Sequence, residues 1–373
     1  MGIVKKVILI VLSVLVFADA GLCVFAVHTV GEAHKAVNKM HKAVKRDSTP
    51  EGRDWDSILK DQKPVSFLLM GIDDGYSAQE KGGRVPHNDT DLIVTINPQT
   101  KKTTVLSVQR DIYATIVGNE KPAHSKYNTS FLYGSIKDPD TGGAKMAIET
   151  TENLVGIPID HYVAINMDGV TGLVDAVGGI DVNNEREFEL DGVHLMPGEQ
   201  HLSGIQALQY ARYRHEDPKG DIGRQDRTRE VVVKVINKLL SADGIANYKK
   251  VLDAVGSNVA TDLTWDDMLK LEQSYAGALK DIESLSMQVA SGAIPGDRQA
   301  YLFVLHDDLL RVQNILRTSL GLTENQYLSN QIPTYESMFG FTPTHANANL
   351  YDAEDSTGTF ENPNVKEPAA DSK

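Results

Sequence analysis

The sequence predicts an α/β fold: a single α/β/α layered domain with a central mixed sheet, preceded by one N-terminal transmembrane helix. Three observations support this prediction. Residues 7–30 form a long apolar run, short apolar runs typical of buried strands begin at residue 65, and segments of helical periodicity alternate with these strands. Such alternation indicates helices packed on both faces of a sheet.

The N-terminal apolar run is long enough to cross a bilayer as a helix. A cleaved signal peptide is the alternative, because Ala18-Asp19-Ala20 resembles a cleavage site with small residues. The run continues past this site to Val30, which favours an uncleaved anchor. Residues 1–6 then form a short cytoplasmic segment.

Three further regions follow the anchor. Residues 31–63 are polar and helix-permissive, and they are expected to form a stalk or linker. Residues 64–342 carry the strand and helix patterns without an interrupting linker, so we assign them to one α/β domain with a helical C-terminal part. Residues 343–373 are rich in polar and acidic residues, a composition that predicts a disordered acidic tail.

Four apolar runs are expected to form strands, at residues 65–72, 92–96, 103–108 and 161–166. Asn97-Pro98 ends the second run and begins a predicted hairpin loop. A further strand-like piece lies around 282–289. Helices are expected at 144–155, 168–177, 202–210, 227–240, 245–255, 265–279 and 306–320. Asp168 is expected to cap the second helix.

Charge and cysteine content exclude some functions. The formal net charge is −14, which disfavours a general nucleic-acid-binding surface. The single cysteine, Cys23, lies in the apolar run, so the chain has neither an internal disulfide nor a cysteine-based zinc site.

The most distinctive motif is a cluster of arginines: Arg212, Arg214, Arg224, Arg227 and Arg229. Arg212 and Arg214 are two residues apart and would share one face of an extended segment, whereas Arg224 and Arg227 would share one face of a helix. The guanidinium fork matches phosphate oxygens, so two such pairs would suit a pyrophosphate. The alternative is a salt-bridged surface, since acidic residues are interleaved with the arginines.

Acidic residues lie beside two of the strands. Asp73 and Asp74 follow the first strand, and Asp89 and Asp91 precede the second. Carboxylates at strand ends could hold Mg²⁺, but Asp is also common in turns, and the residues alone leave both roles open. Gln109-Arg110-Asp111 and Lys126-Tyr127-Asn128 place further cations in loops near the sheet.

Taken in order, these motifs resemble the LytR-CpsA-Psr family of cell-wall glycopolymer transferases. The matching stretches are 69–73, 88–91, 107–111, 126–128, 175–182 and 210–229. The resemblance covers residues 64–320, and its last stretch is the most specific. It implies an α/β/α domain outside the cell, on the membrane of a Gram-positive-type bacterium, with a hydrophobic groove for a polyprenyl chain.

The resemblance also implies a site. The pyrophosphate of the lipid would lie among Arg110, Lys126, Arg212, Arg214, Arg224 and Arg227, while Asp73 and Asp89 match the family positions that hold Mg²⁺. The sequence departs from the family at His87, where Arg is usual and where Arg84 could substitute, at Gln109 in place of Pro, and at Thr228 in place of Gln.

The implied reaction is a phosphotransfer from a polyprenyl-pyrophosphate-linked glycopolymer, such as wall teichoic acid or capsular polysaccharide, to peptidoglycan. Arg110, Arg212 and Arg214 would stabilise charge on the phosphoryl oxygens, with Asp111 or Asp89 as the base. The alternatives are a polyprenyl-pyrophosphate hydrolase, a non-catalytic lipid-carrier binding protein, and a transcriptional regulator or attenuator. The net charge and the lack of a helix-turn-helix pattern disfavour the last of these.

Overall fold

The computed structural model describes residues 37–46, 53–73 and 86–214, most of residues 254–340, and scattered positions between 216 and 238. The predicted anchor, the acidic tail and Arg84 lie outside the described residues, as do most of the helices expected at 227–240 and 245–255. Within the part of the chain that is described, no helix combines the length and the hydropathy needed to cross a membrane.

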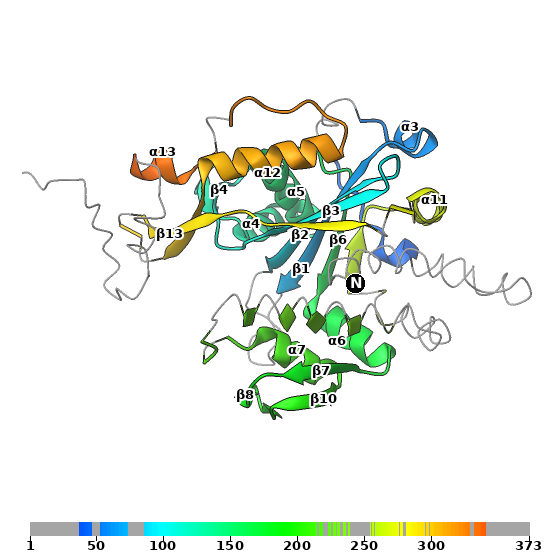
Figure 1. Cartoon of the computed structure of the whole chain (residues 1–373), viewed down its shortest axis with the longest axis vertical. Coiled ribbons are helices and arrows are strands. Elements are labelled where there is room, and N and C mark those ends of the chain that lie inside the picture. Colours follow the sequence, from blue (N-terminus) through cyan, green and yellow to red (C-terminus); the bar gives the residue numbers. More distant parts are fainter. Residues whose placement is uncertain are drawn as a thin grey trace, which may run out of the picture.

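A six-stranded mixed sheet forms the centre of the molecule (Figure 1). Its order is β11 (Val259–Thr261), β6 (His161–Asn166), β1 (Val65–Asp73), β2 (His87–Asn97), β3 (Lys102–Val108) and β12 (Ile282–Leu285). β1 is antiparallel to β2 and parallel to β6. β2 and β3 form the predicted hairpin, with Asn97 opposite Lys102. The predicted central mixed sheet is therefore confirmed.

Helices cover both faces of this sheet (Figure 1). One layer contains α4 (Thr129–Lys137), α5 (Gly142–Val155) and α12 (His306–Ser319). The other contains α3 (Trp55–Lys60), α6 (Met167–Ala176), α7 (Gly204–Arg212) and α11 (Trp265–Tyr275). The side chain of Asn166 caps α6 by accepting a hydrogen bond from the Gly169 N–H at 2.9 Å, so the expectation that Asp168 is the cap was wrong.

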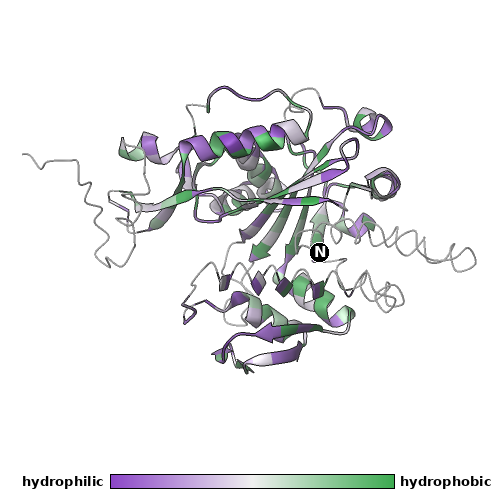
Figure 2. Ribbon diagram, in the orientation of Figure 1, coloured by the Kyte–Doolittle hydropathy of each residue, from purple (hydrophilic) through white to green (hydrophobic). Residues whose placement is uncertain are grey.

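β1 is buried on both of its faces. Phe67 and Leu69 pack in the core beneath α6 and α7, whereas Leu68 and Met70 pack in the core beneath α5 and α12. Successive side chains of a strand point to opposite faces, so a strand between two helical layers must be apolar throughout. Figure 2 accordingly shows hydrophobic residues along the central strands and a largely hydrophilic α12.

Four two-stranded sheets accompany the central sheet in the described residues. They pair β4 (Tyr113–Thr115) with β5 (His124–Lys126), β7 (Ile180–Asn184) with β10 (Gly198–Leu202), β8 (Phe188–Leu190) with β9 (Val193–Leu195), and β13 (Val289–Ala293) with β14 (Ala300–Val304). The strand-like piece expected around 282–289 divides between β12 in the central sheet and the start of β13. A last short helix, α13 (Tyr335–Phe339), packs against Phe303 of β14.

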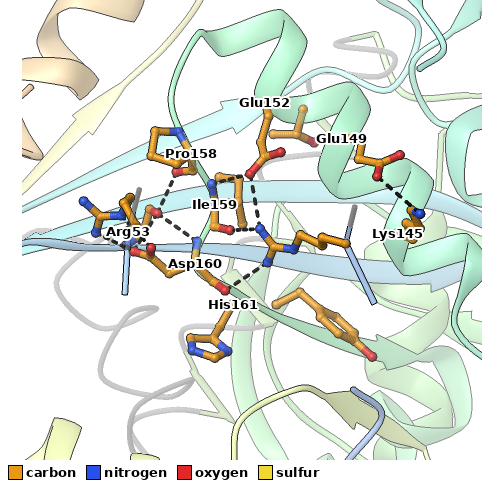
Figure 3. Close-up of polar contacts among 12 residues, drawn as sticks. Arg53, Lys145, Glu149, Glu152, Pro158, Ile159, Asp160 and His161 are labelled. Atoms are coloured by element: carbon orange, nitrogen blue, oxygen red, sulfur yellow. Dashed lines mark hydrogen bonds and ion pairs between the residues drawn. The ribbon is translucent and has the colours of Figure 1, made fainter. Parts of the chain in front are cut away.

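Part of the range expected to be a stalk packs against the domain. Its buried apolar side chains are Val37, Met40, Ile58 and Leu59. The guanidinium of Arg53 donates to both carboxylate oxygens of Asp160, at 2.7 and 2.8 Å, and to the Pro64 carbonyl at 2.7 Å (Figure 3). The packed region therefore extends N-terminal to Pro64.

Arg46 forms a second connection to the loop that precedes β6. Its guanidinium donates to the Glu152 carboxylate at 3.3 Å and to the Asp160 carbonyl at 2.9 Å. Glu152 also accepts a hydrogen bond from the Ile159 N–H at 2.8 Å. Burial outweighs these favourable contacts and raises the pKa of Glu152 to about 7.

Replacing Glu152 by Gln should make the stability of the protein less dependent on pH. A carboxyl group whose pKa is raised by folding binds a proton more readily in the folded state, so its contribution to stability falls as pH rises from 4.5 to about 7. Gln keeps the acceptor but does not titrate. Between pH 5 and pH 8, wild type should lose up to about 3 kcal/mol relative to Glu152→Gln.

Urea unfolding at both pH values measures this difference. Glu189→Gln removes an exposed acid from β8 and is the matched control, which should behave like wild type. The same pH dependence in Glu152→Gln and in wild type would contradict the prediction.

Candidate functional site

The register of the sheet brings several predicted site residues to one edge. β2 is antiparallel to both β1 and β3, so β1 and β3 end where β2 begins. Asp73 is the last residue of β1 and lies opposite His87, the first residue of β2. Arg110 follows β3 at the same edge. Figure 1 shows that β1 ends on the side of the sheet that faces α7.

Asp89 is held from two sides at this edge. Arg110 Nη1 donates to Asp89 Oδ2 at 2.8 Å, and Asn128 Nδ2 donates to Asp89 Oδ1 at 2.7 Å. The sequence marks Asn128 as part of a motif but does not predict its contact with Asp89. The contact forms because the segment between β5 and α4 folds back onto β2, and the spacing of residues along the chain does not show this fold.

Asp111 forms a second charged group beside the first. Its carboxylate lies 2.8 Å from Lys126 Nζ and 3.5 Å from Arg110 Nε. The Lys126 ammonium also lies 5.8 Å from the centre of the Tyr301 ring. The side chains of Asp89, Arg110, Asp111 and Lys126 remain between 16% and 28% exposed, so they are accessible to a ligand yet partly shielded from water.

A buried polar pair lies next to this edge. Asn88 Nδ2 donates to Asp91 Oδ2 at 2.9 Å, and Asn88 Oδ1 accepts from the Phe131 N–H at 3.4 Å. Asp91 is 1% exposed, and this burial raises the pKa of its carboxyl group well above the usual value. The pair connects β2 to α4. Asp91 therefore differs from Asp89, although both carboxylates were predicted as one group.

Asp73 and Asp89 are the residues expected to hold Mg²⁺. Among the described residues, no three His, Cys, Asp or Glu side chains come close enough to form a metal site by themselves. Mg²⁺ is commonly bound through one or two carboxylates together with phosphate oxygens and waters. Two carboxylates at an edge that also carries Arg110 and Lys126 fit this pattern, provided that a phosphate-bearing ligand completes the coordination.

The second set of predicted residues begins where α7 ends. Tyr213 follows the helix, and its buried ring stacks on Phe188 with centroids 4.0 Å apart and planes 12° apart. Arg212 and Arg214 flank this buried residue and are partly exposed, and Arg212 is the last residue of α7 rather than part of an extended segment. Arg212 Nη1 donates to Asp191 Oδ2 at 2.9 Å, in the turn between β8 and β9. Arg224 is also partly exposed.

Arg227 makes a different set of contacts. Its Nε donates to the Tyr210 carbonyl at 3.0 Å, its Nη1 donates to Asp217 Oδ2 at 2.5 Å, and its Nη2 donates to the Tyr213 carbonyl. The guanidinium also lies 5.2 Å from the centre of the Tyr213 ring. All three nitrogens of this side chain therefore bind the protein itself.

Three of the predicted phosphate-binding cations each pair with a carboxylate. Arg110 pairs with Asp89, Lys126 pairs with Asp111, and Arg212 pairs with Asp191. Arginine binds carboxylate and phosphate with the same fork of donors, so a phosphate group could replace these carboxylates. The specific roles that the sequence suggested for these residues stay predictions.

Comparison with known proteins identifies relatives along most of the chain. The sequence model of the LytR_cpsA_psr family matches residues 27–318. The polyisoprenyl-teichoic acid–peptidoglycan teichoic acid transferase TagU of Enterococcus faecalis is 36% identical over 317 residues, which cover 85% of this chain and 98% of that protein.

Solved structures share the fold. Protein gbs0355 from Streptococcus agalactiae aligns with a TM-score of 0.65 and 33% identity over 77% of this chain and 98% of that one. TagT bound to LI-WTA aligns with a TM-score of 0.54 and 25% identity over 76% of this chain and 97% of that one. The sheet order and both helical layers therefore belong to an established fold.

Asp191→Asn should strengthen binding of inorganic pyrophosphate by about threefold, because the exposed carboxylate would no longer compete for Arg212. Asp191 has a positive φ of 49°, which Asn also adopts readily, so the turn should persist and stability should change by less than about 0.5 kcal/mol. Isothermal titration measures the affinity. Glu189→Gln removes a nearby charge as the control, and equal gains in both variants would show only a general charge effect.

Proposed function

The chain belongs to the LytR_cpsA_psr family, and from this membership we propose that it moves a glycopolymer such as a teichoic acid from a polyprenyl-pyrophosphate carrier to peptidoglycan. The observation that carries the proposal is a set of three partly exposed cations, Arg110, Lys126 and Arg212, each paired with a carboxylate, in a chain whose relative TagU is named for this transfer. Such cations suit a ligand with several phosphate charges.

The donor would bind through its pyrophosphate. Arg110, Lys126, Arg212, Arg214 and Arg224 would bind the phosphate oxygens, and the aspartate partners of Arg110, Lys126 and Arg212 would turn to other groups or to water. A hydroxyl of peptidoglycan attacks the phosphorus that bears the sugar. A new P–O bond forms to that hydroxyl oxygen, and the P–O bond to the lipid phosphate breaks.

Two aspartates are candidates for the proton transfer in this reaction. The attacking hydroxyl loses its proton to Asp111 or Asp89, which lie beside Arg110 at 3.5 and 2.8 Å. The arginines stay charged throughout and stabilise the phosphoryl oxygens as the bonds exchange.

Magnesium is the proposed cofactor, and Asp73 and Asp89 are its proposed protein ligands. The ion would neutralise negative charge on the pyrophosphate. Asn128 supports this assignment, since its amide donates a hydrogen bond of 2.7 Å to Asp89. This bond fixes the orientation of the carboxylate before a ligand binds.

We further propose that residues 7–30 anchor the protein in the membrane and that the domain lies outside the cell, next to both substrates. The apolar length of this segment supports the anchor. The hydrolase and the non-catalytic lipid-binding protein remain the alternatives, because both would use the same phosphate-binding residues.

Arg214→Ala should reduce transfer at least about 100-fold, because one phosphate-binding guanidinium is removed. Full-length protein is incubated with Mg²⁺, a polyprenyl-pyrophosphate-linked saccharide and peptidoglycan oligomers, and saccharide attached to the acceptor is measured. Arg311→Ala removes an exposed arginine from α12 and should leave transfer unchanged. Lipid released without an acceptor product would indicate a hydrolase, and lipid binding without turnover would indicate a carrier protein.

Asp89→Asn should abolish the response of transfer to Mg²⁺, because a proposed metal ligand is removed. Asn128→Ala should raise the Mg²⁺ concentration for half-maximal transfer by about tenfold, because Asp89 would lose its orienting hydrogen bond. Titration of Mg²⁺ in the same assay measures both effects. Asp140→Asn, at an exposed residue, is the control. An unchanged Mg²⁺ dependence in Asp89→Asn would exclude this carboxylate as the metal ligand.

A further inference from the structure

We propose that Arg227 and Asp217 act as a positioning pair that fixes the segment carrying Arg212 and Arg214. In this role Arg227 does not contact the pyrophosphate, although its place in the arginine cluster suggested that it would. The inference rests on the proposed function, because it concerns how the phosphate-binding arginines are placed.

The residues that Arg227 contacts lie on both sides of Arg212 and Arg214 in the sequence. Its nitrogens bind the carbonyls of Tyr210 and Tyr213 and the carboxylate of Asp217, so the bound groups lie before, between and after Arg212 and Arg214. One side chain therefore sets the path of the chain at three points. A change in its position would move both arginines together.

Two of the contacts in this region complete the end of α7. The last carbonyls of a helix have no N–H partner within the helix and need other donors. Arg227 Nε donates to the Tyr210 carbonyl, and Thr228 Oγ1 donates to the Ala211 carbonyl at 3.2 Å. Thr228, where the family usually has Gln, thus has a defined structural task beside Arg227.

Burial separates the Arg227 pair from the Arg212 pair. The side chain of Asp217 is 2% exposed, whereas that of Asp191 is 47% exposed. Asp191 can turn into water when a phosphate takes Arg212. If Arg227 turned toward a phosphate, it would leave a buried carboxylate without this guanidinium, which is strongly unfavourable. Arg227 therefore keeps its ion pair with Asp217, whereas Arg212 can exchange Asp191 for a phosphate.

Stacked rings extend the same arrangement to the neighbouring hairpin. Arg227 lies over the Tyr213 ring, and Tyr213 stacks on Phe188 at the start of β8. The turn after β8 carries Asp191, which binds Arg212. The position of Arg212 is consequently fixed in two ways: Arg227 holds the backbone around it, and Asp191 of the β8–β9 hairpin holds its side chain.

The sign of one substitution tests the proposal. Asp217→Asn removes a negative charge near an anion site and would release Arg227, so it should strengthen pyrophosphate binding if Arg227 is a phosphate ligand. If Arg227 is a positioning residue, the same substitution should weaken binding by about tenfold, because the segment is no longer held. Asp191→Asn is the matched exposed carboxylate and should strengthen binding.

Full-length protein is titrated with geranylgeranyl pyrophosphate and with geranylgeranyl monophosphate. The Asp217→Asn variant should lose affinity mainly for the pyrophosphate, since its recognition requires two arginines in register, and a general loss of folding would not change this preference. The double variant Asp217→Asn/Arg227→Gln should bind no worse than Arg227→Gln alone, because residues that act as one unit are not additive. Thr228→Val, which leaves the charges intact, should weaken binding by about threefold.

The outcomes separate this inference from the proposed function. If wild type and Arg214→Ala bind the pyrophosphate equally weakly, the proposed function fails and the positioning pair fails with it. If wild type binds while Asp217→Asn binds as tightly or more tightly, the positioning pair alone is excluded. Reduced pyrophosphate preference in Asp217→Asn and in Thr228→Val, together with a non-additive double variant, would support it.

Discussion

The burial of β1 between two helical layers is the constraint on which the rest of the structure depends. The side chains on both faces of β1 pack into apolar cores, so polar groups are favourable only at the ends of this strand. At one end, Asp160 accepts hydrogen bonds from Ser66 N and from Arg53, which connects the N-terminal segment to the sheet. At the other end lie Asp73 and, on the neighbouring strand β2, Asp89. The site and the N-terminal connection thus occupy opposite ends of one strand.

Much of the fold could be predicted because its dominant signals are local. The strand at 161–166 has the expected bounds, and α5 and α12 differ from expectation by one or two residues. The short strands β7 to β10 were not predicted, because three- to five-residue strands depend on partners brought by tertiary contacts. Asn166 rather than Asp168 caps α6, since either residue could cap a helix and only the backbone path decides between them.

For the candidate site, the sequence predicted which residues belong together but not how they pair. Arg212 and Arg227 looked equivalent as members of one cluster, and their difference arises from the burial of Asp217 relative to Asp191. Asp89 and Asp91 were grouped as carboxylates beside one strand, yet Asp89 is partly exposed whereas Asp91 is buried. Burial of a particular side chain depends on contacts between distant segments, so spacing along the chain cannot supply it.

The pairing of exposed cations with aspartates has a consequence for selectivity. An unpaired arginine cluster would attract every anion around it, including anions of low charge. Here each of Arg110, Lys126 and Arg212 already has a carboxylate within 2.9 Å, so an incoming anion must compete with a carboxylate that already binds the cation. An anion of low charge gains less from this exchange than a phosphate group, which offers several charged oxygens to the same cation. Self-pairing would therefore make binding selective, favouring densely charged phosphate groups over anions of low charge.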